Sequence, residues 1–205
     1  MPRPRSTLLS VELIVEAALK LVDETGDFSF PRIARELGVS QSSLYNRISS
    51  REHIVELLRA HLFTSNPTPS TTDAPWDEAL RMLIRGYRDC FAPHPRLVPL
   101  LVTQTVRAAE VIAMYEDLTL ALERSGLDAA DVAPALSLVD YFALGAALDF
   151  TAPEEVWGPE PEKYPALTRA VRSSPSAPER VERAFEFGLE ALIAGIATRV
   201  KHKVN

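Results

Sequence analysis

The stretch IARELGVSQSSLYNR, residues 33–47, changes character at its middle. Its first part has apolar residues at helical spacing as far as Leu37, and Gly38 can supply the left-handed backbone that ends a helix. The second part starts at Ser40 and is polar apart from Leu44. Two short helices joined at a glycine, the second with an exposed polar surface, are typical of a helix-turn-helix. The alternative is that the second helix is only a solvated connector.

The polar side chains around the second helix are those that bind DNA in other helix-turn-helix domains. Glutamine and asparagine can bond adenine at two points, and arginine can do the same with guanine. Hydroxyl groups and further arginines bond phosphates, which fixes the position of the protein without reading sequence. The candidate DNA-binding residues are Ser29, Arg32, Gln41, Ser42, Ser43, Tyr45, Asn46, Arg47 and Arg51.

The distribution of charge along the chain is compatible with a DNA partner, although the net charge of the whole chain argues against one. The chain of 205 residues has a net charge of -6, which on its own argues against a polyanion. Residues 1–53 carry seven basic and seven acidic side chains, so the remaining chain holds all of the net negative charge. Arginines flank the helix-turn-helix on both sides, and we therefore expect a locally positive face there.

The whole chain reads as a series of helices, with no alternating stretch that would predict a strand. Ser10 and Gly26 bound a first helix, and Ser49 with Glu52 forms a capping box for a fourth. The fold class is therefore all-α, with a three-helix DNA-binding domain over residues 1–53 and a larger ligand-binding and dimerisation domain over residues 54–205. Beyond the stretch TSNPTPSTTDAP we expect helices at about 76–91, 96–103, 107–124, 128–149, 163–173 and 178–200.

The composition excludes several other classes of protein. With 46% hydrophobic residues the chain can bury a core, and a single cysteine, Cys90, excludes a disulfide framework. No charge-free stretch approaches the roughly 20 residues that span a membrane. We expect a cytoplasmic protein without membrane contact. The histidines are scattered and no phosphate loop or nucleophile motif is found, so no metal, cofactor or enzymatic activity is predicted.

The segment FSFPRIARELGVSQSSLYNRISSREHIVELL resembles the amino-terminal signature of TetR-family transcriptional repressors. The Ile-Ala pair, Leu-Gly-Val, Leu-Tyr and a basic residue before the fourth helix stand at the family's spacing. APALSLVDYFALGAALDF and RAFEFGLEALIAGI resemble the two dimer-forming helices of the family members that bind tetracycline. One departure is Pro31, which occupies the position of a base-contacting arginine in those members. The resemblance thus implies an operator-binding dimer with a different base preference.

The last predicted helix favours close contact with another helix. It is apolar nearly all round and contains Gly188 and Gly195 on one face. Each glycine inside a helix costs about 0.5–1 kcal/mol relative to alanine, which suggests that another backbone approaches there. The alternative is a pair of core helices within one chain. The candidate dimerisation residues are Leu136, Val139, Ala143, Ala146, Phe185, Gly188, Leu192 and Gly195.

The middle helices carry large, adaptable side chains that predict an apolar cavity with few polar anchors. The candidate ligand-binding residues are Leu83, Tyr87, Leu101, Gln104, Thr105, Met114, Leu118, Tyr141 and Asp149. By the resemblance, Leu101 replaces the histidine that holds the magnesium–drug complex in tetracycline-binding members, and Leu83 replaces an asparagine. Magnesium–tetracycline is therefore a poor candidate, and we expect a mostly apolar effector.

These observations predict a homodimeric, ligand-responsive regulator that represses from a palindromic DNA operator and is released by a small-molecule effector of unknown identity. Two alternatives remain open. One is a repressor of the same fold that needs no effector. The other is an α-helical small-molecule-binding protein or enzyme whose helix-turn-helix is vestigial.

Overall fold

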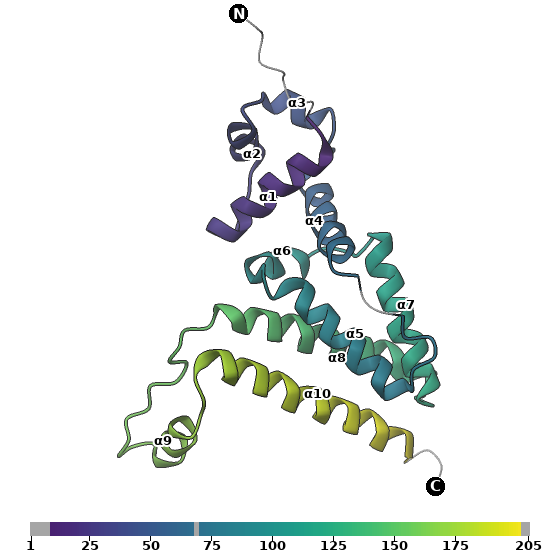
Figure 1. Cartoon of the computed structure of the whole chain (residues 1–205), viewed down its shortest axis with the longest axis vertical. Helices are drawn as coiled ribbons and strands as arrows, with labels where there is room; N and C mark the ends of the chain where they lie inside the picture. Colours follow the sequence, from purple (N-terminus) through teal and green to yellow (C-terminus); the bar gives the residue numbers. More distant parts are fainter. Residues whose placement is uncertain (1–8, 68–69, 202–205) are drawn as a thin grey trace, which may run out of the picture. The chain divides into compact units, whose positions relative to one another are not determined.

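The computed structural model describes residues 9–67 and 70–201, and every regular element in these ranges is a helix (Figure 1). The all-α prediction is confirmed. The chain divides into two compact units, one of residues 1–67 with 96–113 and one of residues 68–95 with 114–205. The α-helices are α1 (Val11–Thr25), α2 (Phe30–Leu37), α3 (Gln41–Tyr45), α4 (Arg51–Ser65), α5 (Trp76–Phe91), α6 (Val98–Leu101), α7 (Ala109–Arg124), α8 (Ala129–Leu148), α9 (Pro165–Arg172) and α10 (Ala177–Lys201).

The first unit is built on α1, which packs against α2 and α4. Ser10 caps α1 by accepting a hydrogen bond from the Leu13 N–H, and Gly26 ends it in the left-handed region at φ 77°. Gly38 does the same between α2 and α3 at φ 65°. Both glycines stand where L-residues with a Cβ would be strained. Fully buried apolar side chains join these helices: Ile14, Ala18, Val22, Ile33, Leu44, Ile48, Ile54 and Leu58.

The start of α4 differs from the predicted capping box. Ser50, and not Ser49, is the N-cap, and its hydroxyl accepts from the His53 N–H. The Ser49 hydroxyl instead lies 3.1 Å from His53 Nδ1. The prediction was wrong by one residue because two adjacent serines offer the same cap, and the helix begins where buried Ile54 and Val55 face the core.

Helix α4 also holds the connector between α6 and α7. Glu56 Oε2 accepts hydrogen bonds from the backbone N–H groups of Arg107 (2.7 Å) and Ala108 (2.9 Å), just before α7 begins. Arg59, which is 5% exposed, donates from Nη2 to the Leu101 carbonyl at the end of α6 (3.0 Å). Arg59 Nε also lies 3.0 Å from Glu56 Oε1. One turn of α4 thus fixes both ends of residues 102–108.

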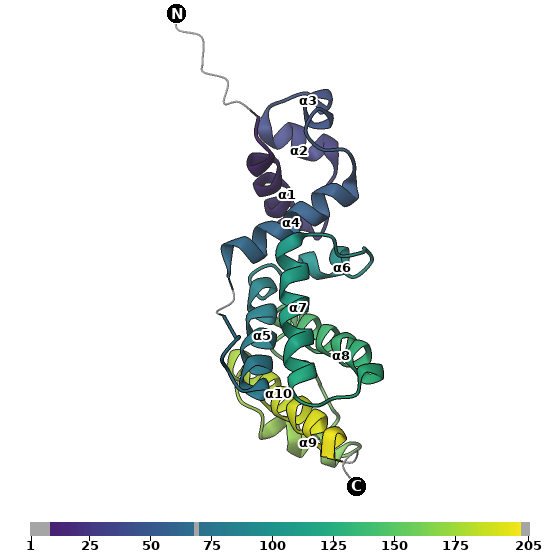
Figure 2. The ribbon, with the colours of Figure 1, turned by 90° about the vertical axis from the view of Figure 1, so that its right-hand side faces the viewer.

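In the second unit α8 crosses α5, and α10 packs against both (Figure 2). Three ion pairs join α10 to α5 along one line: Arg81 with Glu190, Arg85 with Glu186, and Arg88 with Glu182. The Arg88 side chain is buried, and its guanidinium lies 3.9 Å from the centre of the Phe185 ring. Opposite charges at successive turns of the two helices thereby fix their register.

Helix α8 is unusually apolar and mostly uncovered within its own chain. Among the described residues, the segment Ala129–Thr151 is long and apolar enough to cross a membrane by length and composition, and only 17% of its most apolar window is buried. The same segment packs against α5 and α10 along one side. Its other side exposes large apolar side chains, among them Leu138 and Tyr141.

Candidate nucleic-acid interface

Helix α3 presents a polar surface above one buried anchor. Leu44 is fully buried and holds the helix against the core of the first unit. The Ser40 hydroxyl caps α3 by accepting from the Ser43 N–H and lies 2.8 Å from the hydroxyls of both Ser42 and Ser43. The structure brings five predicted DNA-binding residues together, all exposed, on this helix and the two residues after it: Gln41, Ser42, Tyr45, Asn46 and Arg47.

Tyr45 is oriented by an aromatic partner that sequence reasoning missed. Its ring, 56% exposed, stacks on the ring of Phe30 at the start of α2, with centroids 4.6 Å apart and planes 7° apart. The only sequence signal for this pair is Phe30 itself, an aromatic residue in the first turn of α2. The buried residues of that helix are Ile33 and Ala34, so Phe30 is not needed for the core. The stack gives a short, polar helix one rigid exposed side chain.

Two predicted DNA-binding arginines are engaged within the fold. Arg51 donates to the Phe28 carbonyl (2.6 Å) and to Asp27 Oδ1 (2.5 Å), and its guanidinium lies 4.3 Å from the centre of the Phe28 ring. Arg32 donates to Thr25 Oγ1 (2.9 Å). The hydrogen bond from Arg51 lowers the pKa of Asp27 below its ordinary value. Both arginines brace the turn between α1 and α2, so a role of either arginine in DNA binding stays a prediction.

Ser29 and Ser43 also belong to the predicted DNA-binding set, and both are half-buried. Ser29 is the N-cap residue of α2, but its side chain makes no capping hydrogen bond. Ser29 therefore stands at the start of α2, directly before Phe30 in the sequence. The Ser43 hydroxyl is shared with Ser40.

The predicted ligand-binding residues fall into three places. Leu83, Tyr87, Met114 and Leu118 are buried in the second unit. In the first unit Leu101 is buried, whereas Gln104 and Thr105 line a pocket of about 560 Å³ with Glu52, His53, Glu56, Thr103 and Arg107. Tyr141 and Asp149 line a third place, the pocket described below.

A hydrogen-bonded chain of polar groups runs through the interior of the second unit. The Tyr115 hydroxyl donates to Asp140 Oδ1 (2.6 Å), so the Tyr87 hydroxyl, 3.2 Å away, donates to Tyr115. Burial, with the neighbouring Tyr115 and Asp140, raises the pKa of Tyr87 far above its ordinary value, and the phenol stays neutral. The sequence marked Tyr115 only as one of the large side chains of the middle helices and did not indicate Asp140, because their pairing links helices α7 and α8.

Several predicted dimerisation residues pack against other residues of their own chain. Val139, Ala143 and Phe185 are buried in the second unit. A Cβ on Gly188 would overlap the ring of Phe142, which itself stacks on Phe185 at 5.2 Å. The close approach that Gly188 predicts is therefore met by a ring of the same chain. Leu192 is buried, Leu136 and Ala146 are half-buried, and Gly195 is exposed with no neighbour within 4 Å of a Cβ.

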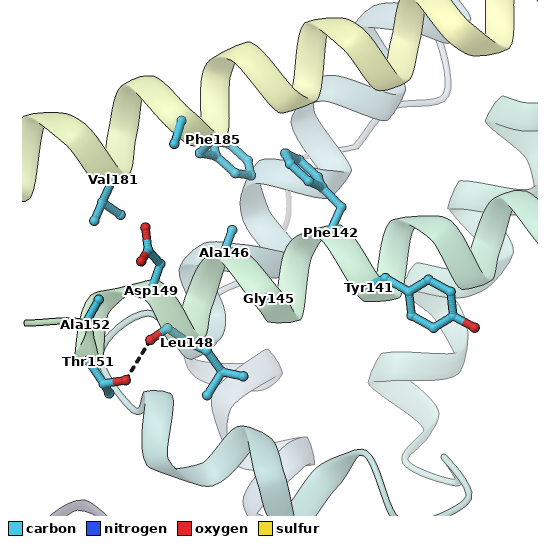
Figure 3. A pocket seen from close by; sticks show the side chains of 11 residues that line it. Tyr141, Phe142, Gly145, Ala146, Leu148, Asp149, Thr151, Ala152, Val181 and Phe185 are labelled. Carbon is cyan, nitrogen blue, oxygen red and sulfur yellow. Dashed lines mark hydrogen bonds between the residues drawn. The ribbon is translucent and has the colours of Figure 1, made fainter. Parts of the chain in front are cut away.

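An open pocket of about 560 Å³ lies between the end of α8 and the start of α10 (Figure 3). Phe142, Ala146 and Asp149 point from α8 and the turn after it toward Phe185 and Val181 of α10, whereas Tyr141 points away along the other side of α8 (Figure 3). Tyr141 is 75% exposed and Phe187 of α10 is 80% exposed. With the exposed Leu138, Leu148 and Phe150, they leave much apolar side-chain surface uncovered on α8, on the turn after it and on α10.

Metal and thiol chemistry have little support in the described ranges. Residues 9–67 and 70–201 contain no group of three His, Cys, Asp or Glu residues placed to hold a metal ion. Cys90 is buried, and this burial raises the pKa of its thiol to about 11, so it stays protonated.

The chain is similar to known transcriptional repressors. Residues 68–200 match the family model described as tetracyclin repressor-like, C-terminal domain. The tetracycline repressor protein class A from transposon 1721 of Escherichia coli is 26% identical over 209 residues, covering 94% of this chain and 93% of that protein. The HTH-type transcriptional repressor DrrR1 of Streptomyces coeruleorubidus is 24% identical, and the match covers 82% of this chain and 61% of the length of DrrR1.

Solved structures share the fold over almost the whole chain. Apo ActR from Streptomyces coelicolor superposes with a TM-score of 0.78 at 23% identity, covering 96% of this chain and 99% of ActR. ActR has also been solved in complex with actinorhodin, with a TM-score of 0.73. BioQ in complex with its double-stranded DNA operator superposes with a TM-score of 0.67 at 25% identity, covering 92% of this chain and 98% of BioQ. The chain belongs to the TetR family of transcriptional regulators.

Proposed function

We propose that the protein is a homodimeric repressor in which α3 of each copy enters the major groove of one half of a palindromic operator. The observation that carries this proposal is the exposed polar set of Gln41, Asn46 and Arg47 on a helix anchored by the buried Leu44. These side chains have the groups that read adenine and guanine edges. Proline at position 31 removes a base-contacting arginine of the tetracycline-binding members, so the operator sequence should differ from theirs.

A second copy of the chain is the partner that best fits the exposed apolar face of α8 and α10. Tyr141 and Phe187 are both more than 70% exposed, and no atom of the chain lies within 4 Å of a Cβ built at Gly145 of α8 or at Gly195 of α10. Two such helices from each copy would bury this face in a four-helix bundle. A two-fold dimer also matches the two-fold symmetry of a palindrome. This arrangement accounts for the apolar character of α8 in a cytoplasmic protein without a membrane.

The effector that releases the operator is proposed to be a medium-sized, mostly apolar molecule. Buried Leu83, Met114 and Leu118 offer apolar surface, and the Tyr87–Tyr115–Asp140 chain offers a few polar groups. The residues do not fit magnesium–tetracycline, because the buried alkyl side chain of Leu101 stands where those relatives have a metal-binding histidine. A ligand can shift the protein only if it binds the released form more tightly.

The experiment that tests DNA reading is selection of bound fragments from the source genome, followed by footprinting of the best fragment. We expect a short palindrome. The Arg47→Ala variant should lose specific binding to that fragment, whereas Arg35→Ala, an exposed arginine of α2 outside the proposed set, should keep it. Equal loss in both variants would assign the effect to general charge.

The oligomeric state is tested separately by sedimentation of the purified protein. The proposal predicts a dimer that dissociates when Tyr141 and Phe187 are both changed to glutamate, with unchanged helix content by circular dichroism. A folded monomer as the wild-type state would contradict it.

A further inference from the structure

An arginine far along the chain forms hydrogen bonds with the end of the first helix. Arg96 begins the segment 96–113, with which the chain returns to the first unit after α5. Both hydrogen bonds come from one nitrogen: Arg96 Nη1 donates to the Asp23 carbonyl (2.8 Å) and to the Glu24 carbonyl (2.7 Å). The start of this segment is thereby attached to the last turn of α1.

The last turn of α1 lacks a positive charge of its own. The final carbonyl groups of a helix have no partner within it, and the helix dipole places partial negative charge there. This turn contains no basic residue, and the carboxylates of Asp23 and Glu24 add to its negative charge. The Gly26 N–H satisfies the Val22 carbonyl, and Arg96 satisfies the next two carbonyls. The Arg96 guanidinium therefore supplies the cation that stabilises this helix end.

The residues that follow this turn hold two of the candidate DNA-binding arginines. Thr25 Oγ1 accepts a hydrogen bond from Arg32 (2.9 Å). Asp27 Oδ1 accepts one from Arg51 (2.5 Å) and another from the Phe28 N–H (2.8 Å). A movement of the last turn of α1 would therefore move the acceptors that place both guanidinium groups.

The two ends of residues 96–101 are attached with different strength. At the far end the Leu101 carbonyl accepts from Arg59 of α4 (3.0 Å), and Arg59 is buried. Arg96 is exposed, so water can replace its hydrogen bonds at little cost in free energy. The contact of Arg96 with α1 can therefore break while the contact with α4 remains.

We propose that Arg96 is a positioning residue for operator binding: it fixes the last turn of α1, and through that turn the guanidinium groups of Arg32 and Arg51. The inference rests on the proposed function, in which these two arginines contact DNA. Any change that draws the start of segment 96–113 away from α1 breaks this contact. By linkage, operator binding then favours the form of the protein in which the contact is made.

The first test measures amide hydrogen exchange of residues 22–28 by mass spectrometry, without DNA. Arg96→Met keeps much of the apolar stem but loses the donors, and it should speed exchange in this stretch about two- to fivefold. Arg96→Lys keeps the charge and can donate, so it should speed exchange less. Arg81→Met breaks an ion pair with Glu190 in the second unit and is the matched control, which should leave this stretch unchanged. Unchanged exchange in Arg96→Met would overturn the proposal.

The second test measures affinity for the DNA fragment selected by the wild type, at a temperature at which circular dichroism shows every variant to be folded. Arg96→Met should bind about two- to fivefold more weakly, Arg96→Lys should recover part of the loss, and Arg81→Met should bind as the wild type does. In an Asp27→Asn background the effect of Arg96→Met should shrink, because both changes act on one turn.

The outcomes separate this proposal from the proposed function. If the wild type selects no fragment, the proposed function fails and the role of Arg96 in DNA binding fails with it. If the wild type binds and Arg96→Met binds equally well, only the role of Arg96 fails. An undiminished effect of Arg96→Met in the Asp27→Asn background would show that Arg96 acts apart from the turn, which also overturns the proposal.

Discussion

The ring of Tyr45 lies flat on the ring of Phe30, so a residue at the first turn of α2 sets the direction of the one aromatic side chain of α3. The buried Leu44 holds α3 against the core of the first unit, and the stack on Phe30 holds the exposed Tyr45 side chain in place. A five-residue helix has little stability of its own. The proposed DNA-binding surface therefore depends on two contacts of α3: the burial of Leu44 and the stacking of Tyr45 on Phe30.

Replacing Phe30 by alanine should weaken binding to the selected DNA fragment by about 3- to 10-fold, because stacked aromatic pairs contribute about 0.5–1.5 kcal/mol beyond their burial. Phe30→Trp, which can still stack, should bind as the wild type does. Fluorescence anisotropy with labelled DNA measures both, and Tyr45→Phe separates the hydroxyl from the ring. Unchanged affinity in Phe30→Ala would show that the stack does not orient Tyr45 for DNA.

The three ion pairs between α5 and α10 should differ in their contribution to stability. Arg88 is buried against Phe185, so Glu182→Gln deprives a buried cation of one of its two carboxylate partners. We expect a loss of about 1 kcal/mol or more in the free energy of unfolding. Glu190→Gln breaks a more exposed pair with Arg81 and should cost less than about 0.5 kcal/mol. Urea unfolding measures both, and equal losses would contradict this ranking.

Two glycines of α10 should respond oppositely to alanine. In Gly188→Ala the new Cβ meets the Phe142 ring, whose Cζ lies 2.9 Å from its position, and displacing a ring stacked on Phe185 should cost about 1–3 kcal/mol. Gly195→Ala meets nothing within 4 Å in its own chain and should gain about 0.5–1 kcal/mol of helix stability. Thermal unfolding at fixed protein concentration compares the two.

The Gly195→Ala variant also reports on the dimer. If the second copy packs closely at this position, the added methyl group should raise the dissociation constant of the dimer while the helix itself gains stability. Sedimentation over a dilution series measures the dissociation. No change would place Gly195 outside the interface.

Acid should destabilise the first unit through Asp27. The Arg51 hydrogen bond, the Phe28 N–H and the charges of Arg51 and Arg32 lower the folded pKa of this carboxyl below its ordinary value of 3.8. A lowered folded pKa contributes stability above pH 3.8, which is lost as the pH falls from there through the folded pKa. Unfolding followed from about pH 5 to about pH 2 should show a smaller pH dependence in Asp27→Asn. An identical profile would rule out this contribution.

Residues that cap or end helices predicted the helix bounds well, but they could not predict contacts between residues far apart in the sequence. Ser10, Gly26 and Gly38 mark helix ends through their own backbone preferences, so the first two helices were predicted at nearly their observed bounds. Arg51 is different, since its partner Asp27 lies 24 residues away and nothing near Arg51 indicates it.

Glycine patterns showed the same limit at α10. Gly188 was expected to face the backbone of another helix, whereas its close neighbour is the Phe142 ring of the same chain, and a pattern cannot distinguish the two. The pairing of Tyr115 with Asp140 likewise depends on how two helices are placed together. Residue type and spacing therefore predicted the short polar helix α3, whose residues are adjacent in sequence, whereas they did not predict the contacts inside the second unit.

The turn of α4 that carries Glu56 and Arg59 sets the shortest piece of chain that can serve as an autonomous DNA-binding fragment. A peptide ending near residue 67 contains both side chains but lacks the Leu101 carbonyl and the Arg107 and Ala108 N–H groups that they bind. Such a peptide would lose these hydrogen bonds and expose the side of α4 that packs against α6. Grafting this DNA-binding domain onto another protein would therefore require residues 96–113 to be supplied as well, so the modular unit is discontinuous in the gene.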